Sequence, residues 1–172
     1  RELLTELYAS GFRSVFFGLE TASERLMEVI DKRETVACCV NAVRMASELG
    51  FHVSATFMFA LPGETHADRL AAAHMANDLQ LDMVRFNNAT PYPGTTLWDM
   101  GKQQGRVFVQ GQYENFNSVS TFIENPFNKM PFSYVPEGAD ENRIRTDILA
   151  SYLAFYMNWK RVLRIFSSGH RE

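Results

Sequence analysis

The sequence predicts an α/β fold built on a parallel sheet or barrel. Three times along the chain, an apolar run ends in a small, polar or turn-forming cluster, and an amphipathic helical pattern follows. Strands that alternate with helices form parallel sheets, and the ligands of such folds gather at the carboxyl ends of the strands. The three clusters lie at such ends, at residues 18–20, 61–65 and 90–95.

Composition limits the classes of function. The 172 residues are 46% hydrophobic and 22% charged, enough for one substantial core. A net charge of -3 offers no basic surface for nucleic acid. We see neither an apolar run of roughly 20 residues nor a signal-peptide pattern, so we expect a cytoplasmic protein without a membrane span. Because the sequence starts with Arg1 rather than Met, we expect a piece of a longer protein.

The first part of the chain is predicted to form a helix, a strand and two further helices. A leucine stripe predicts a helix that stops at Gly11, and residues 14–20 have the pattern of a buried strand. Thr21 and Glu24 make a capping-box pattern, which predicts the start of a short helix. A longer helix is expected over residues 35–49.

The second strand, over residues 53–61, alternates between two kinds of side chain. One set is Val53, Ala55, Phe57 and Phe59, and the more polar set is Ser54, Thr56 and Met58. In a barrel the apolar set would meet the outer helices and the polar set would face inward, which favours an open or ligand-filled interior. Thr65 and Asp68 are expected to cap a helix over residues 67–79.

The third strand, over residues 82–89, is unusually polar for a buried strand because it contains Arg85, Asn87 and Asn88. The prolines that follow it bar a helix until Thr95 or Thr96. That short helix should end near residue 105.

The remaining third of the chain has a different character. Residues 106–138 lose the periodicity and are rich in aromatic residues, so we expect an ordered segment across one face, with a short strand at 106–109. A long helix is expected over 139–166. We therefore divide the chain into residues 1–105 and an extension, 106–172, that packs on them.

Glu20 is the sharpest candidate for chemistry. It shares one face of the first strand with Gly18, and an unpaired carboxylate in an apolar interior costs several kcal/mol. A bound amine, hydroxyl or ribose would satisfy the charge. The alternative is a structural role, in which Glu20 caps the next helix or pairs with Arg33 or Arg85.

Glu64 raises the same choice between function and structure. It follows Pro62 and Gly63, where a tight turn lets the backbone approach a flat heterocycle through main-chain groups. As a residue just before a helix it can also accept from free backbone N–H groups. Both readings stay open at this point.

The sequence lacks the residue patterns of metal sites, disulfide frameworks, hydrolases and kinases. The only two cysteines, Cys38 and Cys39, are adjacent in a helical pattern, which makes neither a metal site nor a disulfide framework. Core packing and a reactive thiol both remain possible for them. The four histidines are dispersed, and neither a Ser-His-Asp order nor a phosphate-binding glycine loop occurs, so hydrolase and kinase readings lack support.

Several motifs in this order resemble one known family. They are Phe17 to Thr21 with Asp31-Lys32, Phe57 to Thr65, Thr90 to Thr95 and, in the tail, Tyr134 to Gly138. Together they resemble the C-terminal half of a radical S-adenosylmethionine (radical SAM) enzyme. The likeness is greatest to the branch that carries a cobalamin-binding domain ahead of the radical domain, the group of the anaerobic magnesium-protoporphyrin ester cyclase and the hopanoid-modifying enzymes.

The resemblance implies a partial six-stranded (β/α) barrel, of which this chain supplies strands four to six. It also implies three cofactors: S-adenosylmethionine, a 4Fe–4S cluster and, for this branch, cobalamin. In such enzymes a Cys-x3-Cys-x2-Cys loop holds the cluster, which cleaves S-adenosylmethionine reductively to a 5′-deoxyadenosyl radical. This sequence lacks that loop, so we expect it in a missing N-terminal half of the barrel and expect no activity from this chain alone.

The resemblance also assigns roles to residues near a small-molecule substrate. The implied cofactor-binding residues are Gly18, Glu20, Ser54, Thr56, Pro62, Gly63, Arg85 and Asn87. Glu20 would contact the methionyl or ribose part, Ser54 and Thr56 would lie near the ribose, and the Pro62-Gly63 turn would border the adenine. Arg85 and Asn87 would lie near the cofactor or substrate. At Ala60 the family usually has Gly, so an extra methyl group would crowd the adenine.

Two alternatives come from other classes. The chain would be a non-catalytic binding or scaffold module if it kept the barrel skeleton without its cluster. An unrelated α/β-barrel aldolase or isomerase would need a catalytic Lys, and no predicted strand contains one. The main reading requires Glu20, Thr56 and Asn87 to face one shared hollow, and it predicts an unpaired strand edge that makes the isolated fragment aggregate.

Overall fold

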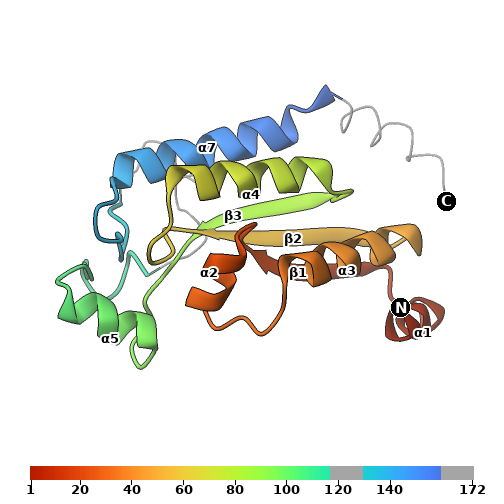
Figure 1. Ribbon diagram of the computed structural model, residues 1–172, viewed down its shortest axis with the longest axis horizontal. Coiled ribbons are helices and arrows are strands. Elements are labelled where there is room, and N and C mark those ends of the chain that lie inside the picture. Colours follow the sequence, from red (N-terminus) through yellow and green to blue (C-terminus); the bar gives the residue numbers. More distant parts are fainter. Residues whose placement is uncertain (117–129, 160–172) are drawn as a thin grey trace.

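A computed structural model describes residues 1–116 and 130–159 of the protein (Figure 1). Its elements are α1 (Glu2–Ala9), β1 (Ser14–Glu20), α2 (Glu24–Val29), α3 (Val36–Glu48), β2 (His52–Phe59), α4 (His66–Asp78), β3 (Met83–Asn88), α5 (Thr96–Gln103) and α7 (Glu141–Tyr156). Within these ranges no helix is both long and apolar enough to cross a membrane.

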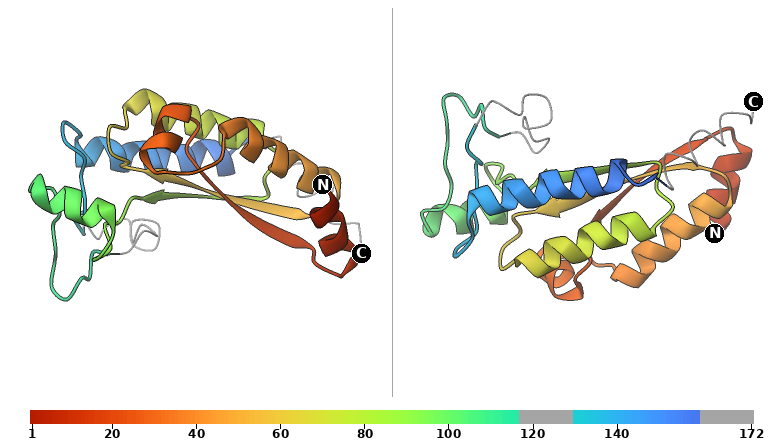
Figure 2. Two further views of the ribbon diagram at one scale, coloured as in Figure 1. Left: turned by 60° about the horizontal axis from the view of Figure 1, so that its bottom comes forward. Right: turned by 90° about the horizontal axis from the view of Figure 1, so that it is seen from above.

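The three strands form one parallel sheet in the order β1-β2-β3, which confirms the predicted parallel α/β fold. Helices α3, α4 and α7 lie on the same side of this sheet (Figure 2). Helix α3 packs on β1 and β2, whereas α7 packs on β3 and on α4. The sheet of the described residues has three strands, so the six-stranded barrel and the division at residue 105 stay predictions.

The alternation of side chains in β2 is confirmed and explains why the helices cover one side. Val53, Ala55, Phe57 and Phe59 are fully buried beneath the helices. Burial of each larger apolar side chain contributes about 1.5–3 kcal/mol, so this face drives the packing. The opposite side, which we call the open face, carries the more polar set.

Apolar side chains also stand partly exposed on the open face. Phe16 of β1 is 52% exposed and Met83 of β3 is 36% exposed, and both pair in register with Ser54. Arg85 is exposed as well. The described residues therefore cover this face much less completely than the helix-covered one.

Two capping predictions had opposite outcomes. The Thr65–Asp68 capping box is confirmed, with each side chain accepting from the other's backbone N–H. The Thr21–Glu24 box is wrong, because α2 begins after Ser23. Glu24 instead accepts from the backbone N–H of Val36 at 3.0 Å, where the start of α3 leaves a donor free.

Two predictions for the extension are wrong in part. The expected strand at 106–109 is a single antiparallel bridge between Val107 and Tyr134. The expected long helix ends at Tyr156, where Asn158, a poor helix former, donates to the side chain of Asn77. The part of that prediction beyond residue 159, like residues 117–129 of the aromatic segment, lies outside the described residues.

The outer edge of β3 is covered by two tyrosines of α7. The Tyr156 hydroxyl accepts from the backbone N–H of Val84 at 3.2 Å and donates to its C=O at 3.0 Å. The Tyr152 hydroxyl makes the same pair of contacts with Phe86, at 2.9 and 3.4 Å. The expected unpaired edge therefore does not exist at β3. The other edge strand is β1, and aggregation through it stays a prediction.

Candidate cofactor-binding site

Register places several predicted site residues in one row across the open face. Gly18 of β1 pairs with Thr56 of β2, which pairs in turn with Arg85 of β3. The neighbouring row contains Asn87, whose side-chain N–H donates to Thr56 Oγ1 at 3.1 Å. Ser54 lies on the same face, two residues before Thr56. Two strands, β2 and β3, thus contribute polar side chains to one surface.

Glu20 reaches this face through an irregular strand end. The register shifts between Gly18 and Glu20, and Glu20 has a φ of 64°, a left-handed conformation that is rare for a residue with a side chain. The carboxylate folds back over Gly18 and occupies the space of a side chain there. A Cβ at position 18 would collide with Glu20 Oε1. Since Gly18 pairs with Thr56, the carboxylate lies over the same row. Glu20, Thr56 and Asn87 therefore share the open face, and the shared hollow stays a prediction.

The charge partner of Glu20 is Lys32, which the sequence analysis missed. Lys32 Nζ lies 3.8 Å from Glu20 Oε1 and also donates to the C=O of Gly18. The expected structural partners, Arg33 and Arg85, do not hold this carboxylate. Burial raises the pKa of Glu20, and the Lys32 charge opposes that rise only in part. A ligand that brings a positive charge or a hydrogen-bond donor would favour the ionised carboxylate.

Asn87 has a buried acceptor without a partner. Its Oδ1 is inaccessible to solvent and makes no hydrogen bond within residues 1–116 and 130–159, although its N–H group binds Thr56. An unsatisfied buried acceptor costs about 1–3 kcal/mol. A hydroxyl or ammonium donor beside Thr56 would remove that cost once it displaced the atoms that cover Oδ1.

The Pro62-Gly63 turn follows β2 at the same end of the sheet. Ala60 has a φ of 63° and Gly63 a φ of 70°, and Arg25 Nη1 donates to the C=O of Gly63 at 3.1 Å. The left-handed conformation at Ala60 favours glycine, which gives a backbone reason for the glycine that the family usually has there. The predicted crowding of adenine by the Ala60 methyl group stays a prediction.

Glu64 does not cap a helix, and the approach of the turn backbone to a ligand stays a prediction. Its side chain is 2% exposed and accepts from the backbone N–H of Ala60 at 2.7 Å and from Arg69 at 3.1 Å. It faces the protein interior, and Thr65 caps α4 instead. Burial raises the pKa of Glu64 to about 7, although Arg69 and the Ala60 N–H favour its ionised form.

The cysteines do not form a metal site. In the part of the chain that the structure describes, no three His, Cys, Asp or Glu side chains gather to hold a metal ion. Cys39 is buried, and its Sγ lies 3.4 Å from Glu34 Oε2. Burial raises the pKa of Cys39 to about 11, which keeps it a thiol and favours core packing. These residues do not fit a 4Fe–4S cluster.

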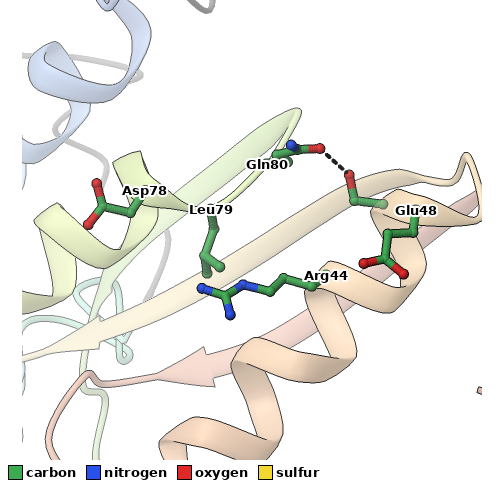
Figure 3. Close-up of a pocket in the computed structure, with 6 residues that line it drawn as sticks. Arg44, Glu48, Asp78, Leu79 and Gln80 are labelled. Carbon is green, nitrogen blue, oxygen red and sulfur yellow. Dashed lines mark hydrogen bonds between the residues drawn. The ribbon is translucent and has the colours of Figure 1, made fainter.

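A pocket lies at the opposite end of the sheet (Figure 3). Arg44, Ser47 and Glu48 of α3 line it together with Asp78, Leu79 and Gln80 at the end of α4. Ser47 Oγ donates to Gln80 Oε1 at 2.9 Å across it. None of the predicted site residues lines this pocket, and it lies near the amino ends of β2 and β3. It is separate from the candidate site.

Comparison with known proteins agrees with the resemblance at the level of the superfamily, while the cobalamin-binding branch and the C-terminal half stay predictions. Residues 1–76 match the Radical SAM superfamily. This match covers less than half of the chain and shows a likeness to that superfamily over these residues. An uncharacterized methyltransferase of Pyrococcus horikoshii is 39% identical over 89 residues, covering 52% of this chain and 19% of the relative. The anaerobic magnesium-protoporphyrin IX monomethyl ester cyclase of Cereibacter sphaeroides is 26% identical over 157 residues, covering 91% and 23%. The chain thus spans about a fifth of the length of these relatives.

Two solved structures share the fold. Coproporphyrinogen III oxidase (HemN) from Escherichia coli, a radical SAM enzyme, aligns with a TM-score of 0.59 at 15% identity, covering 91% of this chain and 29% of that one. The archaeal Methanocaldococcus infernus Elp3 aligns with a TM-score of 0.55 at 17% identity, covering 95% and 39%. At these identities the likeness concerns the fold alone.

Proposed function

We propose that this chain is the S-adenosylmethionine-binding half of a radical SAM enzyme, with its site on the open face at the carboxyl ends of β1 to β3. The observation that carries the proposal is the buried Oδ1 of Asn87 beside Thr56, which has no hydrogen-bond partner among the described residues. The half-buried Glu20 carboxylate over Gly18 supports it.

S-adenosylmethionine carries the groups that this surface needs. Its ammonium group and ribose hydroxyls are donors, which suit the Glu20 carboxylate and the free acceptor of Asn87. Ser54 and Arg85 stand beside Thr56 on the same face, and the Pro62-Gly63 turn offers backbone groups to the adenine. When bound and reductively cleaved, this cofactor supplies a 5′-deoxyadenosyl radical, and the residues of this chain hold and orient it.

The cluster that drives this cleavage must be held elsewhere. The sequence has two cysteines, and both lie in α3 on the helix-covered side. We therefore infer that a preceding part of the protein supplies the cluster loop and the first strands of a six-stranded barrel. Because Tyr152 and Tyr156 cover the edge of β3, β1 is the edge where those strands would add.

The substrate that we propose is a small, largely apolar molecule. Beyond the strand ends, Tyr92, Trp98, Tyr113 and Phe116 pack together, with Tyr92 and Tyr113 each 49% exposed. Exposed rings offer a stacking surface to a flat molecule. The names of relatives point the same way, since the Cereibacter sphaeroides cyclase acts on a magnesium porphyrin. Cobalamin, as in the branch that this chain resembles, is the further cofactor that we propose.

A binding and cleavage experiment on the full-length protein tests the proposal. After anaerobic reconstitution of the cluster, calorimetry should detect S-adenosylmethionine binding, and dithionite should produce 5′-deoxyadenosine. Asn87→Ala should weaken binding, whereas Asn77→Ala, the same change on the outer helix α4, should leave it unchanged. An equal effect of both variants would contradict the proposed site.

The same experiment decides on the scaffold alternative, which the two-cysteine sequence favours. Binding without cleavage would identify a non-catalytic module that keeps the barrel skeleton. Absence of binding would remove both readings. A Cys-x3-Cys-x2-Cys loop encoded upstream is a further requirement of the enzyme reading.

A further inference from the structure

A buried chain of charged side chains joins α7 to the turn that follows β2. Its three inner members are Glu64, Arg69 and Asp147, whose side chains are 2%, 5% and 6% exposed. Charged groups so deeply buried require close partners, since removal from water is costly for each of them. The contacts show what these groups accomplish together.

The contacts run outward from the backbone of the turn. Glu64 Oε2 accepts from the Ala60 N–H at 2.7 Å and from Arg69 Nη1 at 3.1 Å. Arg69 Nε then donates to Asp147 Oδ2 at 2.8 Å. One guanidinium therefore bridges a carboxylate of the turn and a carboxylate of α7, so its position depends on both.

The turn needs such support because of its backbone. Ala60 is held in the left-handed region, which a residue with a side chain adopts only when its surroundings enforce it. The N–H of the Ala60 peptide group donates to Glu64, and its C=O, that of Phe59, accepts from the Ala89 N–H at 2.7 Å. Glu64 in turn is held by Arg69. The position of Arg69 thus supports the N–H side of the Ala60 peptide group.

At its outer end the chain is held by two more side chains. Asp147 Oδ2 lies 2.8 Å from His66 Nδ1, and Asp147 Oδ1 lies 3.4 Å from Arg143 Nε. Arg143 also contacts His66 Nε2 at 2.8 Å. Because a guanidinium can only donate, His66 Nε2 accepts and its proton lies on Nδ1, directed at Asp147. Asp147 is therefore a firmly fixed anchor on α7.

We propose that Arg69 and Asp147 are positioning residues through which α7 fixes the Ala60–Glu64 turn in the shape that receives the adenine of S-adenosylmethionine. The part about the turn stands on the contacts above, and the part about adenine rests on the proposed function. The helix of the extension would then act on the cofactor site without touching the cofactor.

The test compares variants of α7 in the full-length protein. Asp147→Asn removes the charge that holds Arg69. Tyr156→Phe, on the same helix, changes none of the contacts among Glu64, Arg69 and Asp147 and serves as the control. Hydrogen–deuterium exchange of the peptide that spans Ala60 should speed up about tenfold in Asp147→Asn and stay unchanged in Tyr156→Phe. The dissociation constant of S-adenosylmethionine, measured by calorimetry, should rise about 3- to 30-fold in Asp147→Asn alone.

Two further variants test whether geometry or charge matters and whether the effect survives in a variant that folds normally. Arg69→Lys keeps the charge but cannot reach both carboxylates, so it should behave like Asp147→Asn, whereas a role for charge alone predicts a normal protein. Arg143→Gln changes an exposed side chain, so it should fold even if the buried variants do not. It should shift exchange at Ala60 and affinity in the same direction, by less.

The outcomes distinguish failure of the positioning role from failure of the proposed function. If Asp147→Asn and Tyr156→Phe change exchange at Ala60 and cofactor affinity equally, the positioning role is overturned. If the wild-type protein binds no S-adenosylmethionine, the proposed function and the adenine part fail together. Faster exchange at Ala60 in Asp147→Asn would still support the link between α7 and the turn.

Discussion

The tyrosine hydroxyls of α7 should make a measurable contribution to the stability of β3. Replacing both Tyr152 and Tyr156 by Phe keeps the rings, including the edge-on contact between Tyr152 and Phe86, but removes the hydroxyls. Together the hydroxyls make four hydrogen bonds to the backbone of Val84 and Phe86. At about 0.5–1.5 kcal/mol each, their loss should lower the free energy of unfolding by about 2–6 kcal/mol.

Solvent access favours the lower part of this range and orders the single variants. Tyr156 is 44% exposed, so water can replace much of what its hydroxyl provides to Val84. Phe86 is fully buried, so Tyr152→Phe should destabilise more than Tyr156→Phe. Urea unfolding at a constant m-value gives the free energies, and hydrogen exchange at the two backbone groups reports the edge directly. The reasoning fails if the free energy of unfolding of the double variant lies within about 0.5 kcal/mol of the wild-type value and exchange is unchanged. A change of that size is typical of any surface substitution.

Three other changes probe the site. Gly18→Ala should displace the Glu20 carboxylate, lower the free energy of unfolding by about 1–3 kcal/mol and abolish cofactor binding in calorimetry; normal binding would contradict the geometry. Asn87→Leu removes the unpaired acceptor, so urea unfolding should show unchanged or about 1 kcal/mol higher stability while cofactor affinity falls; a clear loss of stability would show that Oδ1 has a partner. For Glu64, burial raises the pKa in the folded state to about 7 from 4.5, so the folded protein binds the proton more tightly. Stability from this group is present below pH 4.5 and declines by up to about 3 kcal/mol as the pH rises through 7. Glu64→Gln should flatten that part of the pH dependence, and an unchanged slope would contradict the pKa.

Local patterns were sufficient to predict the strands and much of the capping. The bounds of β1 match the predicted 14–20 residue for residue, because an apolar run there lies between a helix stop and a polar cluster. Side-chain alternation in β2 identified the face that carries Thr56 before any contact was known. The spacing of Thr65 and Asp68 identified the start of α4. Each of these signals lies within a few residues of the structure that it predicts.

The missed features depend on contacts between distant residues. Lys32 lies twelve positions after Glu20, and only the return of the chain after α2 brings it to the carboxylate. Arg69 and Asp147 are separated by 78 positions, so no local pattern links them. The edge tyrosines fitted the apolar stripe of a helix, and the role of their hydroxyls became evident only with β3 beside them. A single sequence offers no signal for such partners.

The polarity of the open face also bears on what covers it. A helix packed there, like those on the other face, would bury the Glu20 carboxylate against apolar side chains and leave the Asn87 acceptor without a donor. Both would carry a free-energy cost that apolar contacts do not offset. A ligand with ammonium and hydroxyl groups satisfies the same two side chains and still leaves Phe16 of β1 free to pack against further strands at the β1 side. The distribution of polar groups over the two faces therefore favours a ligand-filled barrel interior over a second layer of helices.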